Sequence, residues 1–489
     1  MIAESMLAEP SALECVLLVA LPALLGVAVL RIAGVRFGSD QLAFAAWTWP
    51  AGAFVLALIE LVCLLLGITQ HYWLAVVAVA VVAACAFAWR TRAATPGATT
   101  PAPRKHRWDD VVFWSVVGLG AFATVLAALA AAAEPCVIAD EGTLWAMKAR
   151  AFSYDWFAGD FVRAQGLSTH ADYPPLNPLL QAWTHALASG FTLFSNRVPI
   201  QLCTLSLWLA TAAALRRRVP GWLAGLLLLV LLLDPFWHAA CLSAEADSMV
   251  ALGLVIGCDA WLRSRTSDDR GHWAVASLGL AFALWSKNEA TLYFASACLA
   301  AGVVAVAARR SEVAPAAKRR WPYWLALPLG VVVWQWAWNH WFHFQNDLAG
   351  GNPLGKSFRE LFVAQFADRI GPVLAEIAGL LVRWDRAHGV LLLVLLAPLL
   401  WPRVALARPL GIVTLALLFG LLGANLVYVG SWLELHYHLT TSHARVLFQL
   451  VPVSLLWFAA LYREATALPR AERRESPVVA VAHWRHSAP

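Results

Sequence analysis

Apolar runs of spanning length recur from one end of this chain to the other, and they limit its possible folds more than any other feature. An α-helix needs about 20 mainly apolar residues to cross the hydrocarbon core of a bilayer. We predict about 13 such helices in the 489 residues. Their ranges are 12–33, 43–67, 71–89, 111–133, 198–215, 221–238, 246–262, 273–287, 289–308, 321–343, 388–402, 409–430 and 446–462.

The composition excludes a soluble globular domain. Hydrophobic residues make up 61% of the chain and charged residues only 13%, whereas about 25% of the residues of a soluble domain are charged. So much apolar surface cannot be buried in one aqueous core. The 26 Trp residues suit a protein with two membrane–water interfaces, where indole rings settle. We therefore expect an all-α integral membrane protein.

Basic clusters lie between the apolar runs rather than within them. They are Arg216–Arg218, Arg263–Arg270, Arg309–Arg320, Arg403–Arg408 and the tail after Arg463. Loops rich in Lys and Arg stay on the cytoplasmic side of a membrane. We therefore expect a multi-pass protein of the inner (plasma) membrane, with these basic clusters on the cytoplasmic side. The net charge of +6 does not indicate nucleic-acid binding.

The spans alternate consistently across the membrane only if the segment 176–194 does not cross it. This segment has one apolar face and one polar face, as a helix lying in the interface would have. Its apolar face carries Leu176, Leu179, Leu180, Trp183 and Leu187, and its polar face carries Asn177, Gln181, Thr184 and His185. Segment 354–370 has a similar pattern. We expect a large outer loop, 134–197, that carries interfacial amphipathic helices.

Four parts result from this arrangement. We predict an N-terminal three-helix membrane unit over 1–89 and a transmembrane core over 111–463. The Pro-, Thr- and Ala-rich segment 90–110 between them reads as a cytoplasmic linker. Residues 464–489 form a basic cytoplasmic tail.

The unusual polar clusters all fall on the extracytoplasmic side of this topology. They are Asp140-Glu141, His170 to Pro175, Glu245 to Asp247, Lys287-Asn288-Glu289 and His436 to Arg445. Charges are costly near a membrane and commonly mark function there. We therefore expect a single cleft at the outer membrane surface.

Asp140 and Glu141 come directly after a spanning run, and two interpretations fit them. Asp is a favoured N-cap and Glu suits a first helical turn. The alternative is catalysis by one carboxylate while the other orients it or binds an acceptor. Adjacent side chains on a helix point about 100° apart, so they do not act as a facing pair.

The stretch His170 to Leu180 reads HADYPPLNPLL. Its two consecutive prolines fix an extended entry to a helix. Simple helix punctuation would explain them. The presence of His170, Asp172 and Tyr173 beside them makes a substrate contact the alternative.

Two further clusters carry cations. Lys287 and Glu289 neutralise each other in a tight outer turn, or Lys287 binds a phosphate as a compact cation. Arg445 either reaches to the interface or forks onto phosphate oxygens. His443 and two other histidines precede Arg445, but no acidic or Cys ligands complete a zinc site. We predict no metal and no cofactor; a divalent cation at Asp140, Glu141 and Asp172 is the alternative.

Eight cysteines occur without a CxxC motif or metal-ligand spacing. Most lie inside apolar runs, where Cys packs as a small apolar residue. Cys136 and Cys241 lie near span ends, so a disulfide between them is an alternative to two free thiols.

Taken together, these motifs resemble the GT-C superfamily of polytopic glycosyltransferases. The likeness is to glycosyltransferase family 39, which includes protein O-mannosyltransferases and aminoarabinose transferases. It rests on Asp140-Glu141, Pro174-Pro175-Leu176, Lys287-Asn288-Glu289 and Ser442 to Arg445, and it covers residues 111–463. Two positions depart from the family pattern: Tyr173 replaces a basic residue before the prolines, and Ala290 replaces a Gly.

The resemblance implies transfer of a sugar from a polyprenyl-phosphate donor to a lipid, glycan or protein acceptor at the outer membrane face. Asp140 is then the expected base. The substrate contacts expected are Glu141, His170, Asp172, Tyr173, Lys287, Glu289, His443 and Arg445. A phosphate leaves without a general acid if cations stabilise it, so one base suffices, unlike the two carboxylates of a glycosidase.

Other classes remain open. A transporter or a flippase for lipid-linked glycans would carry charges near the bilayer midplane and broken helices in matched halves. The chain shows no internal repeat. An O-antigen ligase or polymerase would differ in acceptor rather than in chemistry, and a structural membrane protein would have no site at all.

Overall fold

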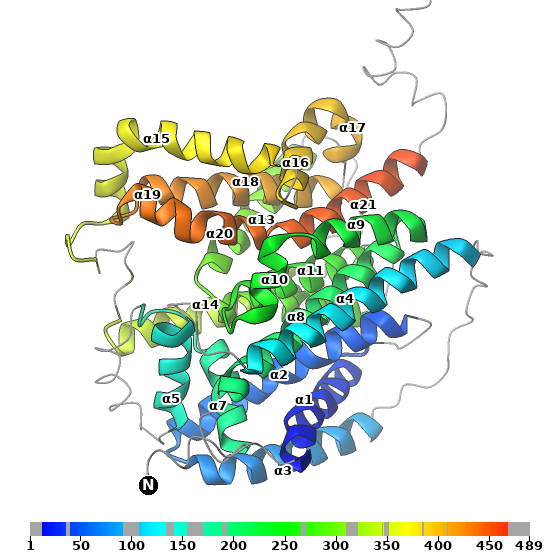
Figure 1. Ribbon diagram of the computed structural model, residues 1–489, viewed down its shortest axis with the longest axis vertical. Helices are drawn as coiled ribbons and strands as arrows, with labels where there is room; N and C mark the ends of the chain where they lie inside the picture. The colour runs from blue at the N-terminus through cyan, green and yellow to red at the C-terminus, as the bar shows by residue number, and fades with distance from the viewer. Residues whose placement is uncertain are drawn as a thin grey trace, which may run out of the picture.

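The computed structural model describes residues 12–35, 40–90, 107–133, 141–153, 170–187, 193–265, 270–309, 321–344, 346, 352–383, 386–407 and 409–467. Within these ranges the regular elements are helices, and no β-strand occurs. The predicted all-α class is therefore confirmed. Figure 1 shows the helices stacked on one another in a single body, with the N-terminal helices at the opposite side from α15 to α18.

The helices divide into three groups along the chain. The N-terminal group is α1 (Ala12–Ile32), α2 (Gln41–Leu65) and α3 (Gln70–Arg90). The middle group is α4 (Arg107–Ala133), the π-helix η2 (Glu141–Ala146), α5 (Met147–Ser153), α7 (Leu176–Leu187), α8 (Leu193–Arg216), α9 (Gly221–Leu232), α10 (Pro235–Leu242), α11 (Asp247–Ser264), α12 (Arg270–Ser286) and α13 (Glu289–Arg309). The C-terminal group is α14 (Trp321–Trp341), α15 (Phe358–Val382), α16 (Gly389–Leu400), α17 (Pro402–Ala405), α18 (Leu410–Val429), α19 (Leu435–His438), the π-helix η4 (Leu439–His443), α20 (Ala444–Phe448) and α21 (Val451–Ala467).

Seven of the described helical segments are long and apolar enough to cross a membrane. They are Gln41–Leu65, Tyr72–Trp89, Trp108–Ala131, Arg197–Arg216, Glu289–Ala307, Leu410–Val429 and Leu435–Ala467. Helices α9 and α10 form one more candidate, bent by 67° between them. The other predicted spans fall on α1, α11, α12, α14 and α16, which are shorter or more polar. These helices fit a multi-pass membrane protein, while the count of 13 crossings stays a prediction.

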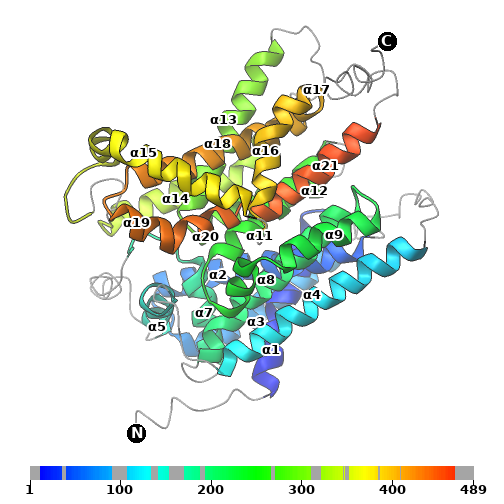
Figure 2. The same cartoon turned by 45° about the horizontal axis from the view of Figure 1, so that its top comes forward.

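Helix α11 runs through the middle of the molecule and carries charges only toward its two ends (Figures 1 and 2). Asp247 is its first residue, and Asp259 and Arg263 lie in its last two turns. The 11 residues from 248 to 258 between these charges are uncharged. At about 1.5 Å per residue, Asp247 and Arg263 lie about 24 Å apart. This spacing resembles the thickness of a hydrocarbon core.

Small residues let α11 and α12 pack with their backbones close together. A Cβ atom on Gly253 would lie 2.5 Å from the Gly279 carbonyl oxygen and 2.7 Å from the Ala283 Cβ. A Cβ atom on Gly279 would lie 2.6 Å from the Gly257 nitrogen. Glycine at these positions permits the close approach that membrane helices use in place of a hydrophobic driving force.

The N-terminal helices pack directly against the predicted core. Helix α2 contacts α7 and α8 along their length. At the charged end of α11, Arg217 binds both Asp40, the N-cap of α2, and Asp259. Arg263 also reaches Asp40 at 3.5 Å and lies over the ring of Trp47. An ionic cluster of Asp40, Arg217, Arg218, Asp259 and Arg263 thus joins α2, α8 and α11.

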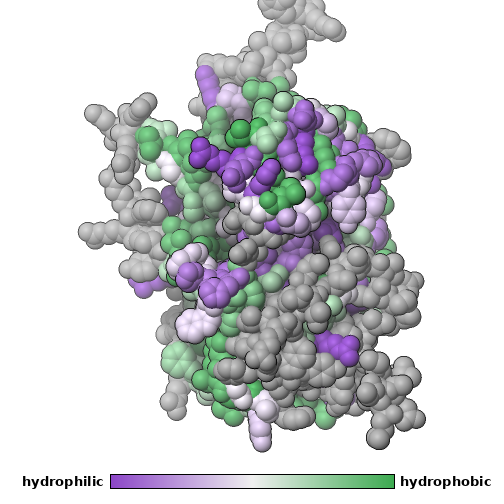
Figure 3. Space-filling model, turned by 90° about the vertical axis from the view of Figure 1, so that its left-hand side faces the viewer, coloured by the Kyte–Doolittle hydropathy of each residue, from purple (hydrophilic) through white to green (hydrophobic). Residues whose placement is uncertain are grey.

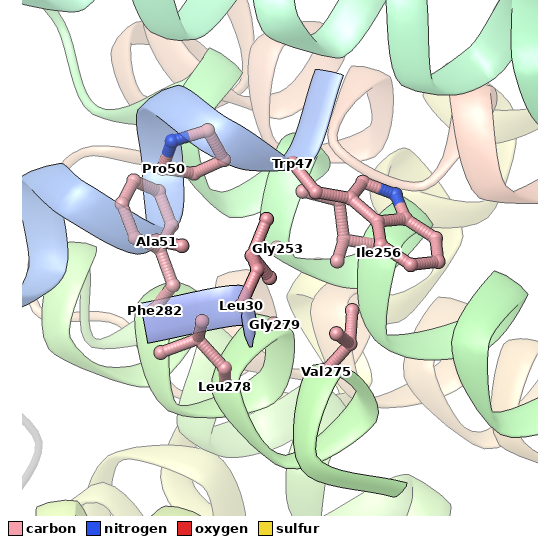
Figure 4. A pocket seen from close by; sticks show the side chains of 10 residues that line it. All are labelled: Leu30, Trp47, Pro50, Ala51, Gly253, Ile256, Val275, Leu278, Gly279 and Phe282. Atoms are coloured by element: carbon pink, nitrogen blue, oxygen red, sulfur yellow. The ribbon is translucent and has the colours of Figure 1, made fainter. Parts of the chain in front are cut away.

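An apolar pocket lies next to this cluster, between α1 and α2 on one side and α11 and α12 on the other (Figure 4). Its cavity volume is only about 10 Å³, barely enough for one water molecule. It is lined by Leu30, Trp47, Pro50, Ala51, Gly253, Ile256, Val275, Leu278, Gly279 and Phe282. No charged side chain lines it, so it offers nothing to bind a phosphate.

Helix α7 was predicted to lie in the membrane interface, and that placement stays a prediction. Both of its faces are buried within the protein, because it is packed against α1, α2, α5 and α8. Its polar side chains meet protein groups instead of water: Asn177 Nδ2 donates to the Ala244 carbonyl at 2.9 Å. Gln181 Nε2 donates to Asn177 Oδ1 at 2.7 Å. An amphipathic pattern is the same whether the polar face contacts water or buried polar groups.

Helix α15 covers one side of the molecule, running beside α18 (Figure 1). Ser357 and Glu360 form a capping box that starts it. The predicted apolar face is present: Phe358, Phe362 and Phe366 contact one another in sequence. Phe358 packs onto the backbone of Gly430 at the end of α18. Whether α15 lies in a membrane interface stays a prediction.

Candidate functional site

Two cations from distant parts of the chain meet at one buried carboxylate. Lys287, in the turn between α12 and α13, places Nζ 3.0 Å from Asp247 Oδ1. Arg445, in α20, places Nε 3.4 Å from Asp247 Oδ2 and pairs with Glu245 through NH1. Glu289 Oε1 lies 3.0 Å from Lys287 Nζ. We refer to Glu245, Asp247, Lys287, Glu289 and Arg445 as the ionic network.

The centre of the network is buried, whereas the side chains of Arg445 and Glu289 at its edge are 20% and 22% exposed. The side chains of Asp247 and Lys287 are 5% and 4% exposed. Burial alone would lower the pKa of Lys287, but the charges of Asp247 and Glu289 outweigh it and raise this pKa above its ordinary value. Lys287 is therefore a cation in the folded protein. A buried cation held by two carboxylates satisfies the rule that buried charges are paired.

Several polar atoms of this region lack a hydrogen-bond partner among the described residues. They are Asp247 Oδ2, Glu289 Oε2, Gln335 Oε1, His443 Nδ1 and Gln449 Oε1. Gln449 donates to Asp247 Oδ1 through its Nε2, so its own oxygen is left over. Buried polar atoms are normally satisfied by protein or by ordered water. Three of them, on Asp247, Glu289 and Gln449, belong to the network or bind it, and each could accept a hydrogen bond from water or from a polar ligand.

The turn that carries Lys287 also reaches the predicted His-Ala-Asp-Tyr-Pro-Pro segment. Asn288 Nδ2 and Asn346 Nδ2 each lie 2.5 Å from Asp172 Oδ2. Gln335 Nε2 donates to the backbone carbonyl of Asp172 at 2.8 Å. Asp172 is 2% exposed. Three amides thus fix this residue beside the network.

Three aromatic rings stack next to Asp172. The Tyr173 ring lies between those of Trp145 and His170, with centroid distances of 5.7 Å and 5.0 Å. His170 has a φ of 56°, which L-residues rarely adopt. Its carbonyl accepts a 2.7 Å hydrogen bond from Lys148 Nζ, which helps to hold this conformation. The stack connects η2 and α5 to the segment that leads into α7.

Lys148 and Asp172 are both shifted toward their neutral forms. Burial lowers the pKa of Lys148 to about 7, and the charge of Asp172 opposes only part of this shift. Burial also raises the pKa of Asp172, against hydrogen bonds from Asn346 and Asn288 and the charge of Lys148. Loss of solvent raises the pKa of Tyr173 well above its ordinary value, and the charge of Glu289 adds to this. A lysine whose pKa lies near neutrality can exchange protons at physiological pH.

Glu141 is engaged by an arginine that the sequence did not single out. Arg197 Nε lies 2.5 Å from Glu141 Oε1, and NH2 lies 3.1 Å from Oε2. Arg197 also donates to the Ala131 carbonyl. The Glu141 side chain is 1% exposed. This geometry favours an anchor for the end of α4 over a substrate contact.

His443 is also held by protein groups. It is fully buried, its Nε2 lies 2.9 Å from Asn425 Oδ1, and its ring packs edge-on against Tyr428. No group of three or more His, Cys, Asp or Glu that could hold a metal occurs in the part of the chain that the structure describes.

The predicted base Asp140 and the cysteine Cys136 lie outside the described residues, as do most of the predicted linker 90–110 and most of the predicted tail 464–489. Cys241 is buried, with its sulfur 3.9 Å from the Thr124 hydroxyl. Asp140 directly precedes Glu141, whose carboxylate is fixed by Arg197.

The structure brings Asp172, Tyr173, Lys287, Glu289 and Arg445 into one region. It adds residues that were not singled out. Asp247 and Glu245 lay in a noted polar cluster but were not chosen as site residues, while Lys148, Asn346 and Gln449 gave no signal because each lies in an ordinary helical or loop context. Polar residues cover part of the end of the molecule that carries α5 and α19 (Figure 3).

Comparison of this chain with protein-family models, with curated proteins and with solved structures found no match.

Proposed function

We propose that this protein is an inverting glycosyltransferase that moves a sugar from a polyprenyl-phosphate donor to a lipid, glycan or protein acceptor. The reaction would take place at the extracytoplasmic face of the inner membrane. One observation supports this most: the turn Lys287-Asn288-Glu289 connects Asp172 with the Asp247–Arg445 pair. Polar segments separated by more than 100 residues thus form one connected region.

The network supplies the cations that a phosphate leaving group requires. Lys287 is a buried point charge, and Arg445 presents a planar fork that suits phosphate oxygens. In the structure both cations form ion pairs with carboxylates. The donor phosphate would take the Arg445 guanidinium from Glu245, whose side chain is only 9% exposed. Cations placed before the reaction stabilise the developing phosphate charge without reorganisation.

In this proposal Asp140 takes the proton of the acceptor hydroxyl. The acceptor oxygen forms a bond to the anomeric carbon while the bond from that carbon to the phosphate oxygen breaks. The polyprenyl phosphate leaves with the electron pair, and the configuration at the anomeric carbon inverts. Asp140 adjoins the fixed Glu141, which gives the base a rigid neighbour.

The remaining predicted contacts divide into two kinds. Glu289, a member of the network, and Asp172 and Tyr173 beside it are proposed to contact the sugar or the acceptor. His170 is proposed to shape this surface through its ring stack. Glu141 and His443 are better explained as anchors, since protein groups hold their side chains.

A transfer assay tests the proposal. Purified protein is incubated with a panel of radiolabelled polyprenyl-phosphate sugars and total membrane acceptors. We expect label in a lipid, glycan or protein fraction, lost in Asp140→Asn and in Arg445→Gln. Asp110→Asn is the matched control, because it removes an aspartate whose partner is Arg216, far from the network. Normal transfer by Asp140→Asn would rule out Asp140 as the base.

A transporter is the second candidate, because one further carboxyl lies inside a spanning helix. Glu60 of α2 is fully buried, and neither carboxyl oxygen has a hydrogen-bond partner in the described residues. Ionisable groups within the membrane commonly mark ion or proton pathways. If no donor is used by folded protein, and if proteoliposomes take up solute or protons in a way that Glu60→Gln abolishes, the transporter replaces the transferase.

A further inference from the structure

A second buried polar pair lies where the chain breaks between α9 and α10. Asp234 is the N-cap of α10, and its Oδ1 accepts a 2.7 Å hydrogen bond from the Phe236 amide. Pro235 comes next, and the two helices meet at 67°. The other oxygen, Oδ2, accepts from the Ala387 amide at 2.6 Å. One side chain thus joins the break to the chain just before α16.

His388, the next residue after Ala387, extends this connection. Its Nδ1 lies 3.8 Å from Asp234 Oδ2, and its Nε2 lies 2.7 Å from the Ala444 carbonyl oxygen. A carbonyl only accepts, so Nε2 carries the hydrogen and donates it. Both side chains, Asp234 and His388, are fully buried. The Phe236 ring packs edge-on against the imidazole, with a centroid distance of 5.6 Å, and restrains its orientation.

The bond to Ala444 lies immediately before a member of the ionic network. Ala444 begins α20, directly after the π-helix η4, and the next residue is Arg445. A π-turn disrupts the regular α-helical hydrogen-bond pattern and often occurs at functional sites. A donor from another helix therefore fixes the backbone one residue before the guanidinium that reaches Glu245 and Asp247.

We propose that His388 is a positioning residue for Arg445, held in place by its hydrogen bond to the Ala444 carbonyl and by Asp234, which fixes the preceding Ala387 amide. His388 does not contact the network itself; it acts through the Ala444 carbonyl. This role rests on the proposed function only in so far as Arg445 binds the donor phosphate. The mechanical link between His388 and Arg445 stands apart from any activity.

The first test uses three substitutions of His388. Gln places its amide nitrogen near the position of the imidazole Nε2, so His388→Gln keeps the donor to Ala444. Asn reaches only the position of Nδ1, and Leu removes both. We expect His388→Asn and His388→Leu to raise the donor KM by about tenfold, as the loss of one hydrogen bond would do. His388→Gln should restore most of the affinity.

A merely structural role would give a different result. It would reduce the amount of active protein and leave the donor KM unchanged in all three variants. A donor KM that is unchanged in His388→Asn and His388→Leu would therefore overturn the positioning role. Thr414→Val serves as the control, because it removes an equally buried side-chain hydrogen bond, to the Ala405 carbonyl, between other helices.

A second test does not use activity and so separates this inference from the proposed function. The melting temperature, Tm, is measured for His388→Leu, Arg445→Gln and the double variant. If His388 acts through Arg445, the double variant loses less than the sum of the single losses. Thr414→Val combined with Arg445→Gln should be additive. Additive losses for His388 and Arg445 would overturn the link even in a protein with full transferase activity.

Discussion

Arg197 binds Glu141 through two nitrogens, with Nε 2.5 Å from Oε1 and NH2 3.1 Å from Oε2. Both side chains are buried. The pair joins the start of η2 to α8, which lies 56 residues further along the chain. The carboxylate of Glu141, which the sequence predicted to act beside the catalytic base, is therefore fully engaged by protein groups.

Removal of one partner of this pair should destabilise the protein strongly. Arg197→Leu leaves the Glu141 carboxylate buried without compensation, and we expect a loss of about 3–5 kcal/mol in the free energy of unfolding. Thermal unfolding in detergent, with tryptophan fluorescence as the signal, measures it. Asp110→Asn, which breaks an ion pair whose aspartate is 40% exposed, should cost only about 0–1 kcal/mol. Equal losses for the two variants would show that Glu141 is not an anchor.

The Lys287–Asp247 pair should behave as a unit. Lys287→Met alone leaves Asp247 with fewer cations, and we expect a loss of about 3–5 kcal/mol of stability. Replacing both residues, with Lys287→Met and Asp247→Leu, removes the buried charge as well and should recover much of that loss. A Tm comparison of the wild type, the single variants and the double variant checks this. A double variant as unstable as the sum of its parts would contradict it.

Stability should depend on pH through Lys148. Its pKa falls from 10.5 to about 7 on folding, so between these values the unfolded chain binds the extra proton and the folded one does not. The contribution of Lys148 to the free energy of unfolding is therefore lowest below pH 7, and it rises with pH up to about 10. The rise is at most about 1.4 kcal/mol per pH unit.

Comparison with Lys148→Met isolates this effect. The stability of the wild type relative to the variant should increase from pH 7 to pH 9 in chemical unfolding. The exposed Lys356→Met controls for the loss of a positive charge as such. A difference between wild type and Lys148→Met that stays constant over this range would exclude a shifted Lys148.

The contact between α11 and α12 should not tolerate a methyl group. In Gly253→Ala the new Cβ would lie 2.5 Å from the Gly279 carbonyl oxygen, so the helices must separate. We expect a loss of about 1–3 kcal/mol. Gly302→Ala in α13 meets no atom within 4 Å and should instead stabilise by about 0.5–1 kcal/mol. Tm measurements decide, and a neutral Gly253→Ala would mean that the two helices are not packed as described.

The helices were predictable and their partners were not. Hydrophobic runs determined where α2, α4, α13 and α18 lie, because the length of an apolar run is a local property. The pairing of Arg445 with Glu245 spans 200 residues, and no local pattern encodes it.

The site was predictable in the same limited way. Polar residues at span ends indicated one common face, which brought Asp172, Lys287 and Arg445 to attention. The ion pair of Glu141 with Arg197 was not predictable, because Arg197 looks like an ordinary residue near the start of a span. The buried partner of Asn177 in helix α7, the Ala244 carbonyl, is not visible in the sequence of that helix.

The ionic cluster on α2 also has a consequence for the order of assembly in the membrane. Asp40 is synthesised 177 residues before Arg217 and 223 residues before Arg263. The carboxylate of Asp40 must therefore stay hydrated, or be bound by another factor, until the intervening helices have been made. The first three helices therefore reach their final positions only after α8 and α11 have been made.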